Sequence, residues 1–168
     1  LTDTSSHSGH QISALLMVPF AEGLIVTGGF DRRLVFRSIN DFSNVVAEFA
    51  GFAWPPIALA WVGTEAGVLA VAGDYDVVSF LRPFTYDDGC VGWTRVGQSK
   101  SMLSPSFSGM PPRVHNLISL PGAAVVASTD IGFRILLQNG TAVLAWDGKV
   151  LGGPFWIAGA DVLGVLFD

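Results

Sequence analysis

Few residues in this chain could carry catalysis or bind a metal. It has three histidines and one cysteine, and it contains neither an HxxxH or HExxH pair nor an acidic cluster with metal-ligand spacing. The Gly-x-Ser-x-Gly elbow of hydrolases is absent, and the serines of 104–109 have no base nearby in the sequence. Asp87-Asp88 could hold a cation, although a solvated turn is the more common role of such a pair. The sequence therefore predicts no catalytic, cofactor-binding or metal site.

Two features are candidates for binding another protein. Arg32-Arg33 follows a Gly-rich turn and could recognise an acidic partner, or it could be an exposed turn without a role. The second feature is an insertion, residues 98–113, which is longer than the usual connection of about 4–6 residues. Its apolar anchors, separated by Ser and Pro, would be Met102, Leu103, Phe107 and Met110. This composition suits an arm that lies in a neighbour's groove, and a solvated or self-packed loop is the alternative.

The elements that carry these residues follow a repeat. A short apolar run, a Gly-rich turn and a second apolar run recur around 12–37, 57–82 and 117–137. No segment keeps a helical period for more than about two turns, so the predicted fold class is all-β. The strands are expected at 12–18, 24–27, 34–36, 45–49, 57–62, 68–71, 77–81, 93–96, 117–120, 123–127, 133–137, 141–146, 155–158 and 162–167. Asn139-Gly140 predicts a hairpin with a type I′ turn.

Unit one resembles a WD repeat. Gly9-His10 and the apolar residues after it look like the Gly-His opening of such a repeat, and residues 24–31 look like its second strand and following turn. The chain is therefore similar to the WD-repeat β-propeller family over about residues 9–168. The match is specific in unit one and a matter of pattern in the other units.

This resemblance implies a set of structural hydrogen bonds. In the family a His, a turn Asp, a strand-two Ser or Thr and a strand-three Trp form a chain that locks the blade. The positions that match are His10, Thr27 and Asp31 in unit one and His115 and Asp130 in unit three. The Trp position of unit one holds no Trp. His7, in a polar arm, is expected to have no role.

The domain organisation follows from the repeats. Residues 1–8 are predicted to be a flexible arm, and four-stranded blades are expected at about 9–50, 51–97 and 114–148, with part of a fourth at 149–168. A closed propeller has about 4–8 blades, so three and a half do not close. The expected partners are other protein chains, or the remainder of a longer polypeptide that completes the propeller.

Composition narrows the classes of function. The net charge of −5 and the scattered Lys and Arg disfavour nucleic-acid binding. The single cysteine, Cys90, fits a reducing compartment, so an intracellular and cytoplasmic location is expected. No signal peptide is visible, and the uncharged stretch 49–64 is interrupted by two prolines, so no transmembrane span is expected.

Repeats without catalytic groups predict a protein–protein interaction scaffold, a WD-like propeller segment that acts as a structural subunit of a larger complex. One alternative is a propeller-fold enzyme with an active site in the channel, which would need convergent polar residues where the first strands are mostly apolar. Another is a trafficking or peripheral membrane scaffold protein. No cofactor is expected.

Overall fold

The structure is a computed structural model that describes residues 7, 10–64, 67–100, 112–129, 132–147, 150–157 and 162–167. In these residues the chain is all-β. The first sheet consists of β1 (Ile12–Val18), β2 (Leu24–Gly29), β3 (Arg33–Ser38) and β4 (Val45–Ala50). The second consists of β5 (Ala58–Val62), β6 (Val68–Asp74), β7 (Val77–Thr85) and β8 (Val91–Gln98). The third consists of β9 (Val114–Leu120), β10 (Ala124–Thr129), β11 (Gly132–Leu137) and β12 (Ala142–Asp147). Strands β13 (Val150–Ile157) and β14 (Val162–Phe167) form a two-stranded sheet.

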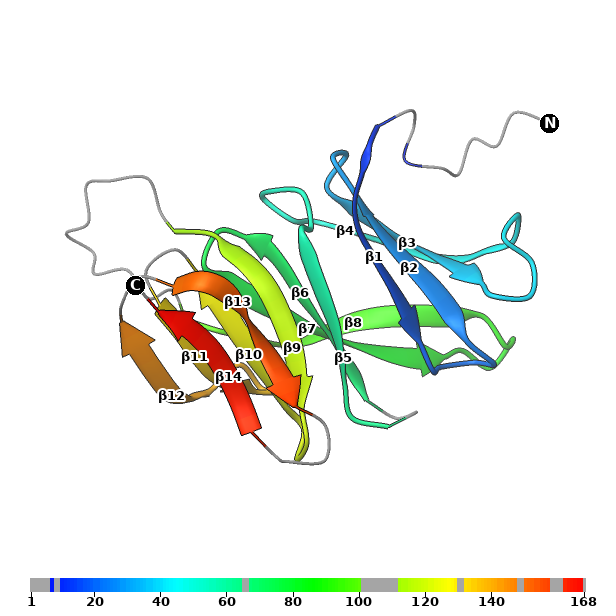
Figure 1. Cartoon of the computed structure of the whole chain (residues 1–168). Helices are drawn as coiled ribbons and strands as arrows, with labels where there is room; N and C mark the ends of the chain where they lie inside the picture. The colour runs from blue at the N-terminus through cyan, green and yellow to red at the C-terminus, as the bar shows by residue number, and fades with distance from the viewer. Residues whose placement is uncertain are drawn as a thin grey trace.

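The sheets lie beside one another in chain order, and we call them blades 1 to 3 and partial blade 4 (Figure 1). Within each blade, strands that follow one another in the sequence pair antiparallel. The first strands β1, β5, β9 and β13 contact one another in succession, so they form the inner edge of the arrangement. No helix that is long and apolar enough to cross a membrane is found in the part of the chain that the structure describes.

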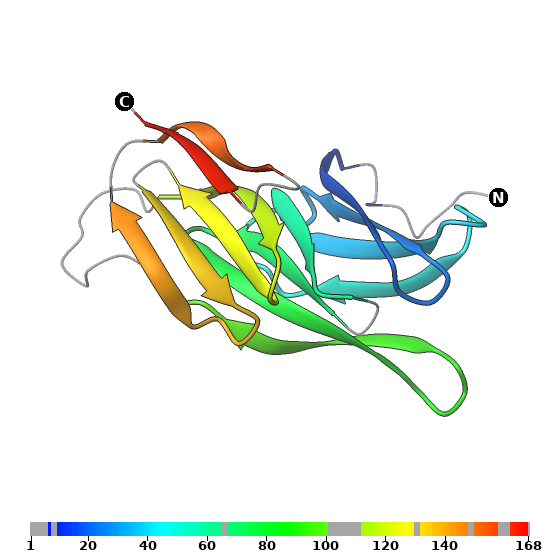
Figure 2. The same cartoon turned by 60° about the horizontal axis from the view of Figure 1, so that its bottom comes forward.

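The predicted strands are all present, and the main differences concern their length. The hairpin of β7 and β8 is longer than expected and reaches toward blade 1, where β8 contacts β4 (Figure 2). At its other end β8 includes Gln98. The Ser99 amide donates to the Val78 carbonyl at 2.8 Å, and the Val78 amide donates to the Ser99 hydroxyl at 2.9 Å. The first three residues of the predicted insertion are therefore held against blades 2 and 3, since the Lys100 carbonyl also accepts a hydrogen bond from Arg134.

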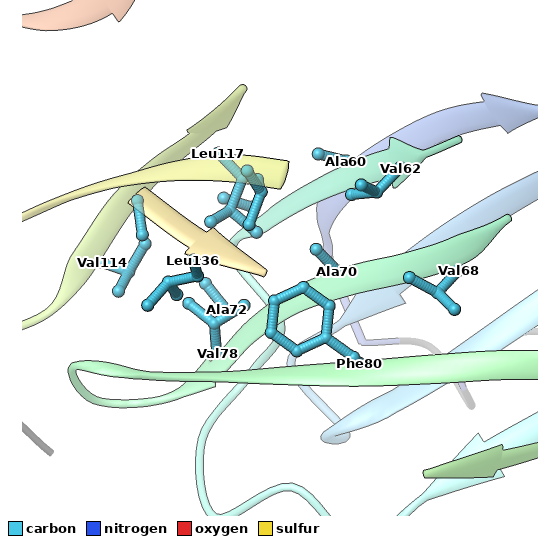
Figure 3. Close-up of a cluster of buried hydrophobic side chains, with 13 residues drawn as sticks. Ala60, Val62, Val68, Ala70, Ala72, Val78, Phe80, Val114, Leu117 and Leu136 are labelled. Atoms are coloured by element: carbon cyan, nitrogen blue, oxygen red, sulfur yellow. The ribbon is translucent and has the colours of Figure 1, made fainter. Parts of the chain in front are cut away.

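The core lies between the blades, and β6 shows how the sequence produces it. Successive side chains of a strand point to opposite faces of its sheet. Val68, Ala70 and Ala72 face blade 3, in the cluster that Figure 3 shows, whereas Leu69 and Val71 face blade 1. All five side chains are at most 1% exposed. The uninterrupted apolar run in the sequence is therefore that of a strand covered on both faces.

The Asn-Gly hairpin between β11 and β12 is confirmed, but its turn differs from the prediction. The Gly140 amide donates to the Leu137 carbonyl at 2.8 Å, and the Leu137 amide donates to the Thr141 carbonyl at 2.9 Å. In this turn only Gly140 has a positive φ, +84°, so the turn is not of type I′. The Asn139 side chain accepts a hydrogen bond from the Thr141 amide at 2.9 Å, which stabilises this longer turn.

Candidate functional site

A buried histidine joins the N-terminal segment to blade 1. The His7 ring is 5% exposed, its Nδ1 lies 2.9 Å from Oδ1 of Asp31, and its Nε2 lies 2.9 Å from Oγ1 of Thr27. Because a carboxylate only accepts, Nδ1–H is the donor to Asp31. The Thr27 hydroxyl also lies 3.4 Å from the Val35 carbonyl, so β3 contributes a backbone group where the WD pattern has a Trp.

The histidine in this network is His7, so the prediction of His10 in that role was wrong. His10 is exposed, and its amide donates to the His7 carbonyl at 2.7 Å. This tight turn places the ring of His7, three residues before His10, over β2. Gly29 was the sequence signal for the contact between His7 and β2, since a Cβ at that position would overlap the His7 ring.

Replacing Asp31 or His7 by alanine is expected to lower the free energy of unfolding by about 1–3 kcal/mol, because each change leaves a buried polar partner unpaired. His10→Ala is the matched control and should change it by less than about 0.5 kcal/mol, since the side chain is exposed. Urea unfolding followed by circular dichroism measures the three variants. Equal effects for His7→Ala and His10→Ala would contradict the assignment.

The corresponding contact in unit three is only partly described. His115 lies exposed on β9, whereas Asp130 lies outside the described residues, so their pairing stays a prediction. Of the candidate partner-binding residues, Met102, Leu103, Phe107 and Met110 also lie outside the described residues.

Arg32 and Arg33 lie exposed at the turn between β2 and β3. Arg32 takes a positive φ of 65°, and its side chain forms no ion pair with a carboxylate of the described residues. Arg33 lies 3.5 Å from a carboxylate oxygen of Glu48, and both side chains are at least 40% exposed. Arg32 is therefore the more available cation.

A buried ion pair that the sequence analysis missed joins blade 2 to blade 3. The Arg134 guanidinium on β11 lies 3.3 Å from Oδ2 of Asp76, with side-chain exposures of 7% and 2%. The guanidinium also donates to the carbonyls of Asp76 at 3.0 Å and Lys100 at 2.6 Å. A buried carboxylate needs such compensation. In blade 2 the turn residue Asp76 thus pairs with an Arg of the next blade, whereas Asp31 of blade 1 accepts a hydrogen bond from a His.

An aromatic cluster packs β3 of blade 1 against β8 of blade 2. Phe36 of β3 stacks on Trp93 of β8, with ring centroids 4.1 Å apart and planes 17° apart. Phe20 and Trp61 meet the same Trp93 edge-on at 6.1 and 6.4 Å. Trp93 is 8% exposed, so blade 2 supplies the large ring that packs against β3.

On the other face of blade 1, the inner strand carries exposed apolar side chains. Leu15 pairs with Thr27, and Met17 pairs with Ile25, so these side chains point away from the Leu16 and Val18 side that packs toward blade 2. Leu15 is 65% exposed and Met17 59%. We call Leu15, Met17 and Ile25 the free face of blade 1.

Solved structures of other proteins share this arrangement of sheets. No protein-family model and no curated protein matches the sequence. A chain in the crystal structure of the Mitotic Checkpoint Complex aligns with a TM-score of 0.64 and 16% identity, over 95% of this chain and 48% of that one. BBS1N, in its complex with ARL6DN, aligns with a TM-score of 0.64 and 15% identity, over 95% and 50%. A protein of unknown function from Bacteroides caccae aligns with a TM-score of 0.53 and 10% identity, over 89% and 51%.

The fold is a partial β-propeller. The predicted fold class, a segment of about three and a half four-stranded blades, is confirmed by these neighbours and by the sheet order. The chain spans about half the length of the structures it matches.

Asp87-Asp88, the acidic pair considered for a cation, lies between β7 and β8. Among the residues that the structure describes, no three His, Cys, Asp or Glu side chains gather closely enough to hold a metal ion. At the tip of the β7–β8 hairpin, Asp88 instead accepts a hydrogen bond from the Cys90 amide at 2.9 Å. The side-chain hydrogen bond and the charge of Asp88 raise the pKa of the exposed Cys90 thiol, which favours the protonated form.

Proposed function

We propose that this chain is a protein–protein interaction scaffold, a propeller segment that acts as a structural subunit of a larger assembly. The observation that carries the proposal is the free face of blade 1. The residues of blade 2 that correspond to this face are Leu59 and Trp61 on its inner strand, and they are partly buried against blade 1. Leu15 and Met17 have no such cover in the described residues, and each is more than half exposed.

Another propeller blade is the cover that this face fits. Leu15 and Met17 would pack against it as Leu59 and Trp61 pack against blade 1. Burial of each large apolar side chain contributes about 1.5–3 kcal/mol, which favours association over exposure. The blade would come from a partner chain or from the remainder of a longer polypeptide. The matched chains, each about twice as long as the aligned region, support this, and two of them come from structures of protein complexes.

The scaffold role is favoured over an enzyme by the character of the inner edge. The exposed large side chains of β1 are Ile12, Leu15 and Met17, which offer neither a proton-transfer group nor a nucleophile. An intracellular site of action without nucleic-acid binding is part of the same proposal. It is supported by the single exposed Cys90 and the net charge of −5.

The test is the double variant Leu15→Gln/Met17→Gln. We expect the wild-type chain to associate, with itself or with a stoichiometric partner, in size-exclusion chromatography with light scattering. The variant should elute at the 17.8 kDa mass of one chain, because its free face no longer gains from burial. Its free energy of unfolding should change by less than about 0.5 kcal/mol, since both side chains are exposed.

Phe42→Gln is the matched control. Phe42 is 60% exposed but lies outside the free face, so its substitution should leave association unchanged. A wild-type chain that is a monodisperse, cooperatively melting monomer and binds no partner would refute the proposal. Equal loss of association in the control and the double variant would refute the role of the free face.

A further inference from the structure

The boundary of blades 1 and 2 contains a pocket of about 210 Å³ that none of the contacts described above uses. An apolar cavity of about 150 Å³ accommodates a benzene ring, so this pocket has room for one large side chain. Its principal lining residues come from the β2–β3 turn, the linker between the blades, the β6–β7 turn and the segment before β9: Phe30, Trp54, Ile57, Gly73, Tyr75 and Arg113.

Backbone hydrogen bonds fix the walls of this pocket. The Trp54 amide donates to the Gly73 carbonyl at 2.9 Å, and the Ile57 amide donates to the Ala72 carbonyl at 2.9 Å. The third wall is tied by the Val114 amide, which donates to the Tyr75 carbonyl at 2.9 Å. A pocket whose walls are held before binding loses little conformational entropy when a ligand enters.

Three apolar side chains of the pocket are substantially exposed. Phe30 is 53% exposed, and Trp54 and Ile57 are each 37% exposed. The Trp54 and Tyr75 rings meet edge-on at 5.2 Å. Tyr75 takes a left-handed φ of 60° in the β6–β7 turn, much as Arg32 does in the β2–β3 turn. Exposed aromatic walls around a concave site are typical of a binding surface.

The charge at the pocket favours an acidic ligand. The Arg113 guanidinium lies 4.5 Å above the Trp54 ring and forms no ion pair with a carboxylate of the described residues. Arg32, two residues after Phe30 in the same turn, is exposed and also without an ion pair there. Of the carboxylates whose side chains the structure describes in these turns, Asp31 accepts a hydrogen bond from His7 and Asp76 pairs with Arg134.

We propose that this pocket binds a peptide segment of a partner protein, in which an apolar side chain fills the pocket and a neighbouring carboxylate pairs with Arg113. Arg32, exposed in the same turn as Phe30, adds positive charge on this side of blade 1. The site goes beyond the scaffold proposal, because it lies between blades 1 and 2, whereas the free face is on the opposite side of blade 1.

The probes are three fluorescein-labelled tripeptides, titrated with the 168-residue chain and followed by anisotropy. Asp-Phe-Asp carries the proposed features, Asn-Phe-Asn lacks the charge, and Asp-Ala-Asp lacks the aromatic side chain. We expect Asp-Phe-Asp to bind about tenfold more tightly than either control, which corresponds to a difference of about 1.4 kcal/mol. Its affinity should also fall as salt is raised, because Arg113 is only partly buried and its ion pair with the peptide is screened.

Three variants locate the binding. Arg113→Gln and the exposed-turn variant Phe30→Ser should each weaken Asp-Phe-Asp binding about fivefold or more, as expected for the loss of one ion pair or one contact ring. Arg82→Gln, at an exposed arginine away from the pocket, should leave binding unchanged. The melting temperature of each variant shows that it is folded.

Several outcomes would overturn the site. These are no binding of Asp-Phe-Asp at about 1 mM, equal affinity for Asn-Phe-Asn, or unchanged binding by both Arg113→Gln and Phe30→Ser. Each result leaves the light-scattering test of the free face unaffected. Conversely, tripeptide binding by a chain that never associates would support the pocket and refute the role of the free face.

Discussion

Replacing Arg134 by alanine is expected to lower the free energy of unfolding by about 3–5 kcal/mol, because the Asp76 carboxylate would stay buried without its cation. Asp76→Ala should have an effect of similar size, since it leaves the guanidinium buried instead. The two side chains are only 7% and 2% exposed, so water does not replace the lost partner. Urea unfolding followed by circular dichroism measures both variants.

The matched control is Arg33→Ala. Arg33 also pairs with a carboxylate, that of Glu48, but at 3.5 Å and with both side chains largely exposed, so its loss should cost less than about 1 kcal/mol. The double variant Arg134→Met/Asp76→Leu should recover much of the loss, because apolar side chains of similar size leave no buried charge. An Arg134→Ala variant as stable as Arg33→Ala would contradict the role of the pair.

Gly140→Ala is expected to cost about 2–5 kcal/mol, the sum of backbone strain and overpacking. Gly140 has a φ of +84°, which disfavours any side chain, and a Cβ there would overlap the backbone of Gln98 in blade 2. Neither obstacle is the end of a flexible side chain that could move aside. Thermal and urea unfolding of the variant measure the loss.

Gly122→Ala separates the two contributions. Gly122 has a φ of +80°, close to that of Gly140, but a Cβ there would meet no atom within 4 Å. Its substitution should cost about 1–2 kcal/mol, the strain alone. Equal losses at the two glycines would show that the contact between the β11–β12 turn and β8 adds nothing to stability.

The strands could be predicted because their signals are local. Apolar runs such as 68–71 in β6 and Gly-rich turns such as the one before β3 are read from a few neighbouring residues. The type of the Asn139-Gly140 turn was missed, since the Asn139 side chain bonds the Thr141 amide and only Gly140 becomes left-handed. The dipeptide Asn139-Gly140 predicted the hairpin, whereas the hydrogen bond of the Asn139 side chain determined the type of its turn.

The contacts between distant residues could not be predicted in the same way. His10 fitted the Gly-His pattern, but the turn from His7 to His10 placed the earlier ring over Asp31. The Asp76–Arg134 pair joins residues 58 apart on different blades, which no repeat pattern within one blade reveals. The only sequence signal for this pair was Arg134 inside the apolar run of β11, because a buried arginine needs a partner.

The two-sided burial of β6 has a consequence for how damage spreads through the molecule. In the part of the chain that the structure describes, each blade is covered by its immediate neighbours, and links between blades such as Gln138 to Val62 and Ser13 to Pro56 join adjacent units. Stability is then close to a sum of nearest-neighbour terms along a row, as in a one-dimensional lattice, and no single centre holds the whole. A defect at one boundary weakens the two units that meet there, and the middle of the row is better protected than its ends.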